Sequence, residues 1–293
     1  MTAAPELATG TGVVLSADAG QSARRGRSVA LYLALGCLIA LILAAALANV
    51  LPIQNPMAIH PLASYHGPSA GHWFGTDQLG RDQFARAIYG ARISLIVGFS
   101  ATALAALIGT ALGLVGGYLQ GVTDTVVMGL MDVLLAFPGI VIALALTSFL
   151  GPSVRNVILA IAVLSVPVFA RLTRSVGLSL AQREFVQVAR TLGTPAWRII
   201  TFELGPNVAG AVLAFVPVMV AVSILVEGTL SFLGIGVPPP TPTWGTMIAQ
   251  GQSVFATSSY MSLLPAAMMF LTILALNTVG RWLSRRSDRG RAV

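Results

Sequence analysis

Long apolar stretches recur along the chain and are separated by short polar segments. The first stretch, Val29 to Leu51, contains no charged residue, and its 23 residues can cross about 30 Å of hydrocarbon at about 1.5 Å per residue. Uncharged runs of this length are typical of membrane-spanning helices. We therefore expect an all-α membrane protein with six transmembrane helices, over residues 29–51, 93–116, 126–150, 157–176, 208–226 and 261–280.

Composition supports the same class. Of the 293 residues, 56% are apolar and 9% are charged, which lies outside the range of soluble domains. The 17 basic residues are all arginine, and an intracellular N-terminus would place 13 of them on the cytoplasmic side and four outside (Arg81, Arg86, Arg92 and Arg155). The net charge of +7 therefore indicates membrane orientation and no nucleic-acid partner, and predicts a multi-pass plasma-membrane protein with both termini in the cytoplasm.

The segments between the apolar stretches suggest a simple organisation. Ala46, Leu47 and Ala48 could mimic a signal-peptide cleavage site, but the apolar run before them is too long for a signal core. The prolines after Leu230 argue against a helix in the second long outer segment. We expect a disordered cytoplasmic tail (1–28), a first transmembrane helix (29–51), an outer loop with a short amphipathic helix (52–91), a core (92–283) with a cytoplasmic loop (178–207) and an outer loop (228–258), and a basic cytoplasmic tail (284–293).

The stretch from Ser179 to Asn207 is a polar island between two apolar stretches. Its pattern predicts two short helices broken at Gly193, the first opened by a capping box of Ser179 and Gln182, the second by Thr194 with Pro195 at its first position. One face of the first helix is apolar, with Phe185, Val188, Ala189 and Leu192. Such an amphipathic elbow suits docking to a partner outside the bilayer, or lying on the lipid headgroups.

Few polar side chains interrupt the apolar stretches. Asp132 and Pro138 fall within the third stretch, and Glu227 ends the fifth. An acid in a membrane segment is costly and suggests function, yet structural pairing of Asp132 is an equal alternative to gating. Gly109, Gly113 and Gly117 form a stripe that lets another helix approach closely, and Asp82 and Arg86 are spaced for an i, i+4 ion pair.

The residue types limit the chemistry that the chain can perform. His60, His66 and His72 are irregularly spaced and suggest no metal site, and the single cysteine, Cys37, suggests packing. A chain without lysine cannot contain the phosphate-binding motif GxxxxGK[ST], so we expect no ATPase site and no catalytic residues. A secondary transporter stays a less favoured alternative because the intramembrane acids are few.

Four motifs resemble the permease subunits of bacterial ATP-binding-cassette (ABC) importers in the dipeptide, oligopeptide and nickel branch. They are HWFGTDQLGRDQFARAIYGARISL from His72, LMDVLLAFPG around Asp132, LSFLGIGVPPPTPTWG from Leu230, and the island around Gly193. The island resembles the family's cytoplasmic signature loop in its glycine and in Pro206, thirteen residues later. It departs from the family pattern at Gln187 and Val188, where Glu and Ala are usual, and at Glu203 and Gly205.

This resemblance implies the type I ABC importer permease fold and half of a translocation pathway for di- and oligopeptides, or alternatively for nickel or another small solute. It implies as partners a homologous second permease, two cytoplasmic ATPases that hold ATP and Mg, an extracytoplasmic binding protein and the lipid bilayer, with no cofactor in this chain. It places ATPase coupling in the polar island, at Glu184, Gln187, Ala189, Arg190, Gly193 and Pro195. The intramembrane positions expected for the pathway or its gating are Asp132, Pro138 and Glu227, and the long outer loops place the outer mouth at Asp77, Arg81, Asp82 and Trp244.

Overall fold

The computed structural model describes the backbone of residues 11–291 and the side chains of residues 29–286. This part of the chain is helical, and its strand-like pairing is limited to one isolated bridge between Thr76 and Asp82. The elements are α1 (Thr11–Ala46), η1 (Pro61–Ala63), α2 (Gln83–Leu119), α3 (Gly121–Ala136), α4 (Gly139–Leu150), α5 (Val154–Ala181), α6 (Glu184–Thr191), α7 (Ala196–Arg198), the π-helix η2 (Ile199–Leu204), α8 (Gly205–Phe232), α9 (Trp244–Gln252) and α10 (Tyr260–Arg291).

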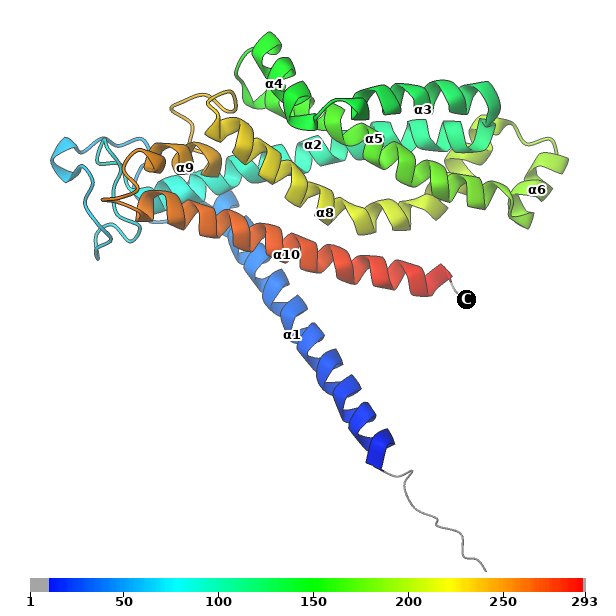
Figure 1. Cartoon of the computed structure of the whole chain (residues 1–293), viewed down its shortest axis with the longest axis horizontal. Helices are drawn as coiled ribbons and strands as arrows, with labels where there is room; N and C mark the ends of the chain where they lie inside the picture. The colour runs from blue at the N-terminus through cyan, green and yellow to red at the C-terminus, as the bar shows by residue number, and fades with distance from the viewer. Residues whose placement is uncertain (1–10, 292–293) are drawn as a thin grey trace, which may run out of the picture.

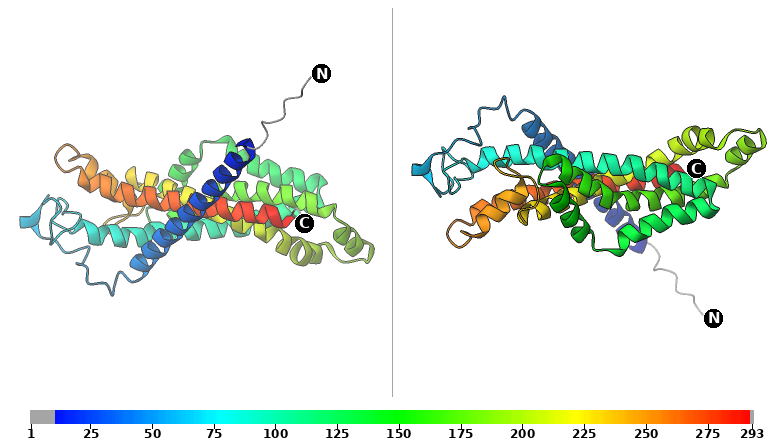
Figure 2. Two further views of the ribbon diagram at one scale, coloured as in Figure 1. Left: turned by 90° about the horizontal axis from the view of Figure 1, so that it is seen from below. Right: turned by 90° about the horizontal axis from the view of Figure 1, so that it is seen from above.

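The helices α2, α3, α5, α8 and α10 run along one long axis (Figure 1). Residues 47–82 and α9 gather at one end, which we call the loop end, and α6 lies at the opposite end (Figures 1 and 2). We call residues 182–204, which connect α5 to α8 at that opposite end, the elbow. The two polar regions of the chain are therefore separated by the length of the bundle.

Within the described residues, five helical segments are long and apolar enough to cross a membrane, and the pair α3 and α4 makes a sixth only if counted as one broken span. The single helix predicted over 126–150 is wrong in its geometry, because α3 and α4 meet at an angle of 89°. Phe137 is extended and Pro138 caps α4. A residue before proline avoids the helical conformation, and proline removes a backbone donor, so the helix breaks here.

Helices α2 and α5 approach each other through glycines of α2. A Cβ on Gly109 would lie 2.6 Å from the Cβ of Phe169, and one on Gly113 would overlap the Thr173 hydroxyl and the carbonyl oxygen of Ala170. The Thr173 hydroxyl of α5 lies 3.3 Å from the carbonyl oxygen of Gly109. The predicted glycine stripe is confirmed as the contact of two spans.

Several predicted boundaries in the first third of the chain are corrected. Residues 1–10 of the predicted disordered tail lie outside the described residues, but α1 already begins at Thr11. Alanine, arginine and glutamine are good helix formers, and extending an existing helix avoids the cost of nucleation. The first helix ends at Ala46 instead of Leu51, and the predicted amphipathic loop helix is the first part of the continuous α2.

The remaining corrections concern the last third of the chain. Helix α9 lies where proline was expected to exclude helix, because the prolines precede it and Thr243 opens it with a capping box that includes Thr246. Helix α10 continues past Gly280 to Arg291, through the predicted basic tail. Proline disrupts a helix only within about a turn of its own position, so the prediction that the prolines exclude helix from the whole outer loop was wrong.

The glycine contact predicts a measurable loss of stability. In Gly113→Ala the new methyl group would overlap the carbonyl of Ala170, and the resulting separation of α2 and α5 should cost about 1–3 kcal/mol. We expect a lower thermal unfolding midpoint and less folded protein in detergent, measured by fluorescence-detected size-exclusion chromatography. Gly129→Ala on α3 is the matched control, because a Cβ there meets no described atom within 4 Å. Equal midpoints for the two variants would refute the contact.

Candidate functional site

The elbow is held against the ends of α2, α5 and α8 by an apolar cluster. Val186 of α6 is fully buried, and Ala189 packs partly against the same cluster. The other buried members are Leu114, Tyr118, Ala181, Ile199, Leu204 and Val208. The elbow is therefore a packed part of the bundle and would move with these helices.

Helix α6 ends in a tight glycine turn. Gly193 has φ +76°, its N–H bonds the carbonyl of Arg190 at 2.9 Å, and the N–H of Thr194 bonds the carbonyl of Ala189 at 3.0 Å. These two bonds make a Schellman motif, which requires a left-handed residue that glycine adopts without strain. A Cβ on Gly193 meets no described atom within 4 Å, so the backbone conformation alone explains the glycine.

Polar bonds fix the orientation of α6. The guanidinium of Arg190 stacks 4.5 Å from the centre of the Tyr118 ring, and its Nε donates to the Tyr118 hydroxyl at 3.2 Å. The side-chain amide of Gln187 donates to the carbonyl of Ala181 at 3.1 Å. Of the predicted coupling residues, Gln187, Ala189 and Arg190 thus attach α6 to α2 and α5, while Glu184 is exposed in its first turn.

The apolar face predicted for α6 points mainly outward. Phe185, Val188 and Leu192 are exposed, Leu192 to 79%, whereas the buried residue is Val186. The helix also starts later than expected, because α5 continues to Ala181 and leaves Ser179 inside it. Pro195 caps α7, one residue after the expected cap at Thr194. The elbow therefore exposes an apolar ridge of Phe185, Val188 and Leu192 at the end of the molecule.

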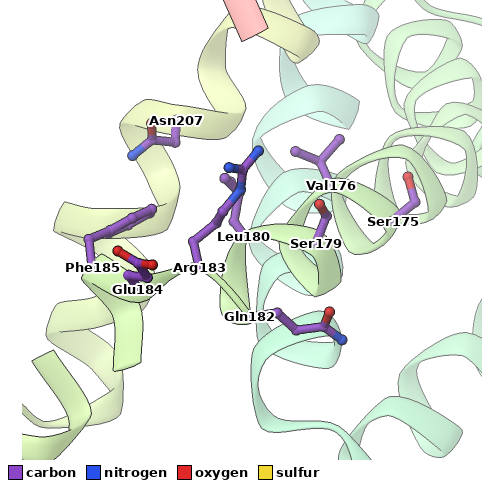
Figure 3. A pocket seen from close by; sticks show the side chains of 9 residues that line it. All are labelled: Ser175, Val176, Ser179, Leu180, Gln182, Arg183, Glu184, Phe185 and Asn207. Carbon is purple, nitrogen blue, oxygen red and sulfur yellow. The ribbon is translucent and has the colours of Figure 1, made fainter. Parts of the chain in front are cut away.

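An open pocket of about 890 Å³ lies beside this ridge, between the end of α5 and the starts of α6 and α8 (Figure 3). Arg183 and Glu184 line it together with Asn207. Ridge and pocket together form an irregular surface of mixed polarity, which is suited to contact with another protein.

At the loop end, the predicted mouth residues hold the loop in place. Asp77, Arg81, Asp82 and Trp244 are buried, with at most 8% exposed. Asp77 accepts from the Nε of Arg81 at 2.7 Å, and Asp82 caps α2 through the N–H of Ala85 at 2.8 Å. The indole of Trp244 donates to the carbonyl of Ala87 at 3.1 Å. These side chains shape the loop from within and do not line an open surface.

The expected pair of Asp82 and Arg86 is replaced by other contacts. Asp82 Oδ1 lies 2.9 Å from His72 Nδ1, and Arg86 Nε lies 3.6 Å from Asp77. Asp82 is the N-cap of α2, so its side chain turns back to the helix start instead of along the helix toward Arg86. The buried guanidinium of Arg86 also donates to Gln250 of α9 at 3.3 Å. Arg86 thus links α2, the loop and α9.

The acids expected inside the membrane segments have different surroundings. Asp132 of α3 pairs with Arg171 of α5 at 2.6 Å, and both side chains are more than half exposed. Glu227 lies within α8, not at its end as predicted, and is 1% exposed. The hydroxyls of Ser94 and Ser231 donate to its carboxyl group at 2.8 and 2.7 Å. Pro138 marks the break between α3 and α4.

One charged pair was not anticipated from the sequence. Arg174 of α5 binds Asp124 of α3 through two hydrogen bonds of 2.5 Å each. Arg174 and Asp124 are 50 residues apart in the sequence, and no local pattern connects them. Two arginines lie in the predicted span 157–176, and two acids lie in or just before the predicted span 126–150. Since charged groups in a membrane need partners, these counts suggest pairing, but they do not indicate which residues pair.

The two pairs between α3 and α5 predict unequal effects. Asp124→Asn should leave the partly buried Arg174 without its partner and lower stability by about 1–3 kcal/mol, while the exposed pair lost in Asp132→Asn should cost about 1 kcal/mol or less. Thermal unfolding of the purified variants measures both. The exchange Asp124→Arg with Arg174→Asp should restore part of the loss. If Asp132→Asn abolishes transport at normal abundance and stability, Asp132 has a gating role.

Comparison with known proteins places this geometry in context. Residues 109–292 match the family described as "Binding-protein-dependent transport system inner membrane component". The chain is 40% identical over 214 residues to the glutathione transport system permease protein GsiD of Pectobacterium atrosepticum, covering 73% of this chain and 71% of that protein. It is 38% identical over 239 residues to the dipeptide transport system permease protein DppC of Alkalihalophilus pseudofirmus, covering 82% and 79%. The chain therefore belongs to the family of binding-protein-dependent transport system inner membrane components.

Proposed function

We propose that this chain forms half of the translocation pathway of an ABC importer for short peptides, and that the elbow couples it to a cytoplasmic ATPase. The observation that carries the proposal is the exposed apolar ridge of Phe185, Val188 and Leu192 on a short helix that is packed against three long helices. A partner that binds the ridge and moves α6 would also move the ends of α2, α5 and α8.

The proposed partners follow from the two ends of the molecule. Two ATPases bind the elbow of this chain and of a homologous second permease, and they supply the ATP and Mg sites. An extracytoplasmic binding protein delivers substrate at the loop end, where the hydrogen bonds of Asp77 with the backbone and side chain of Arg81 hold the loop in one shape. This arrangement requires both termini and the elbow in the cytoplasm, as the arginine distribution indicates.

A peptide substrate is supported by the relatives, whose names specify glutathione and dipeptide transport. Both names describe short peptide-like solutes. The test is ATP-dependent uptake by vesicles that contain this permease with its second permease, ATPases and binding protein, using labelled di- and tripeptides. Competition by unlabelled peptides but not by free amino acids is the expected result. ATP-dependent uptake with which no unlabelled peptide competes would refute the peptide substrate, and it would leave the assignment as an ATP-driven importer intact.

A substitution in the elbow tests the coupling role. Gly193→Val places a β-branched residue in a left-handed conformation, at a cost of about 1–2 kcal/mol, enough to weaken ATPase docking about tenfold. We expect loss of ATP-driven uptake and of ATPase co-purification at unchanged membrane abundance, whereas Gln187→Glu should be tolerated.

Gly151→Val is the matched control, because Gly151 also has a positive φ (+84°) but lies in the turn between α4 and α5, away from the elbow. The backbone of Gly151, with ψ 158°, lies in a region that is essentially restricted to glycine, so this variant also suffers backbone strain, and it should keep its ATPases. Normal uptake and ATPase binding in Gly193→Val would indicate that the elbow is only a surface helix, and would refute its proposed coupling to the ATPase.

The orientation is tested by cysteine labelling in a Cys37→Ala background. An impermeant thiol reagent should modify His66→Cys in the exposed loop of intact cells, and Gln187→Cys in the exposed elbow only after permeabilisation. The reason is the excess of arginines on the proposed cytoplasmic side. The reverse labelling pattern would refute the orientation and the coupling role together.

A further inference from the structure

Two polar side chains at the start of α2 are buried with most of their hydrogen-bonding groups unused. Gln83 and Arg86, three residues apart on neighbouring positions of the helix surface, are 2% and 1% exposed. The nitrogen and the oxygen of the Gln83 amide, and Nε and Nη1 of Arg86, have no partner within the described residues. Buried polar groups in folded proteins are almost always paired, so these four atoms indicate a bound ligand at the loop end.

The nearest carboxylate does not neutralise Arg86. Nε of Arg86 lies 3.6 Å from Oδ2 of Asp77, beyond the distance of a good hydrogen bond, and the same oxygen accepts from Nε of Arg81 at 2.7 Å. Oδ1 of Asp77 accepts the backbone N–H groups of Leu79 and Arg81, at 2.8 and 3.0 Å. Asp77 thus balances one of two buried arginines and leaves one positive charge without a counter-ion. Burial of such a charge is strongly unfavourable.

The other neighbours of Arg86 supply no negative charge. Oδ2 of Asp82 accepts the N–H of Ala85 at 2.8 Å, and its Oδ1 lies 2.9 Å from Nδ1 of His72. On the side of α9, Nη2 of Arg86 donates to the neutral amide of Gln250 at 3.3 Å. In the part of the chain that the structure describes, Asp77 is therefore the one acid within 4 Å of the Arg86 guanidinium.

The unpaired atoms favour an anion over water. Nε and Nη1 of Arg86 and the amide nitrogen of Gln83 are donors, and against these three nitrogens stands one unpaired acceptor, the amide oxygen of Gln83. A water molecule would leave the positive charge in place, whereas an anion accepts from the nitrogens and cancels the charge. Because both side chains are enclosed, the ligand is small and is not the carboxylate of a peptide. A halide ion has these properties.

We propose that Arg86 and Gln83 bind one chloride ion where α2 meets α9. The site goes beyond the import function proposed above and does not depend on which solute the pathway carries. Arg86 contacts Gln250 of α9 and lies beside Asp77 of the loop, and Trp244 attaches α9 to α2 through the carbonyl of Ala87. The ion therefore stabilises the joint between α2, the loop and α9.

Hydrogen–deuterium exchange of the purified complex tests this site, because a ligand bound at the joint suppresses its local opening. Backbone amides of α9 and of the start of α2 should exchange more slowly in sodium chloride than in sodium gluconate of the same concentration, whose anion is too large to be enclosed. At a chloride concentration about ten times the dissociation constant, the exchange rate should fall about tenfold. Bromide should replace chloride, and its anomalous scattering in crystals of the complex should locate one ion beside Arg86 and Gln83.

Two substitutions at the site and one control make the test specific. Arg86→Gln removes the unbalanced charge and should abolish the difference between the two salts. Gln83→Glu places a carboxylate next to the guanidinium, so slow exchange should no longer require chloride. Arg155→Gln is the control, because it removes an exposed arginine at the start of α5 and should keep the full chloride response.

Equal exchange of the unaltered complex in chloride and in gluconate would show that water occupies the site and would overturn the proposal. A chloride response that persists in both Arg86→Gln and Gln83→Glu would locate the ion elsewhere and would also overturn it. If Arg86→Gln fails to assemble, Gln83→Glu and the bromide position decide the question. Exchange is measured without peptide or ATP, so a wrong substrate or coupling assignment leaves this result unaffected.

Discussion

Polar groups inside the spans have no water to bind, so each needs a partner within the protein, and this constraint organises the bundle. Glu227 receives hydroxyls from α2 and from its own helix, and thereby ties α8 to Ser94 of α2. Arg174 binds Asp124 and ties α5 to α3. Asp132 and Arg171 form a second, exposed pair between the same two helices, and the backbone break at Pro138 separates α3 from α4.

The tight contact between α2 and α5 gives these bonds a rigid base. Without a hydrophobic force between helices in lipid, close backbone approach supplies the packing energy, and the glycines of α2 allow it. The elbow joins this base through Val186 and Tyr118, and the loop end joins it through Trp244. A displacement of α6 therefore reaches the helices of the pathway directly, as an importer driven by external ATPases requires.

Much of the function could be predicted from the sequence, because the motifs that indicate it each depend on neighbouring residues. The polar island with Gly193 requires only a helix end and a left-handed residue, both of which depend on neighbouring positions. The partners of Glu227 and Arg174 were not readable. Ser94 lies 133 residues from Glu227, and Asp124 lies 50 from Arg174, so only the packing of helices reveals which side chains meet. The burial of the predicted mouth residues could not be predicted either, because the motif that contains Asp77 does not indicate whether its side chain is buried or exposed.

The sequence by itself determined the helical membrane class, the approximate spans and the position of the elbow, because hydrophobicity and helix ends act over a few neighbouring residues. Only the tertiary structure decided that α2 is one helix, that α3 and α4 bend by 89°, and that Phe185, Val188 and Leu192 point outward. The last case shows the physical reason. An apolar helix face identifies a surface that avoids water, but whether the chain itself or another molecule covers that surface depends on how the remaining helices pack.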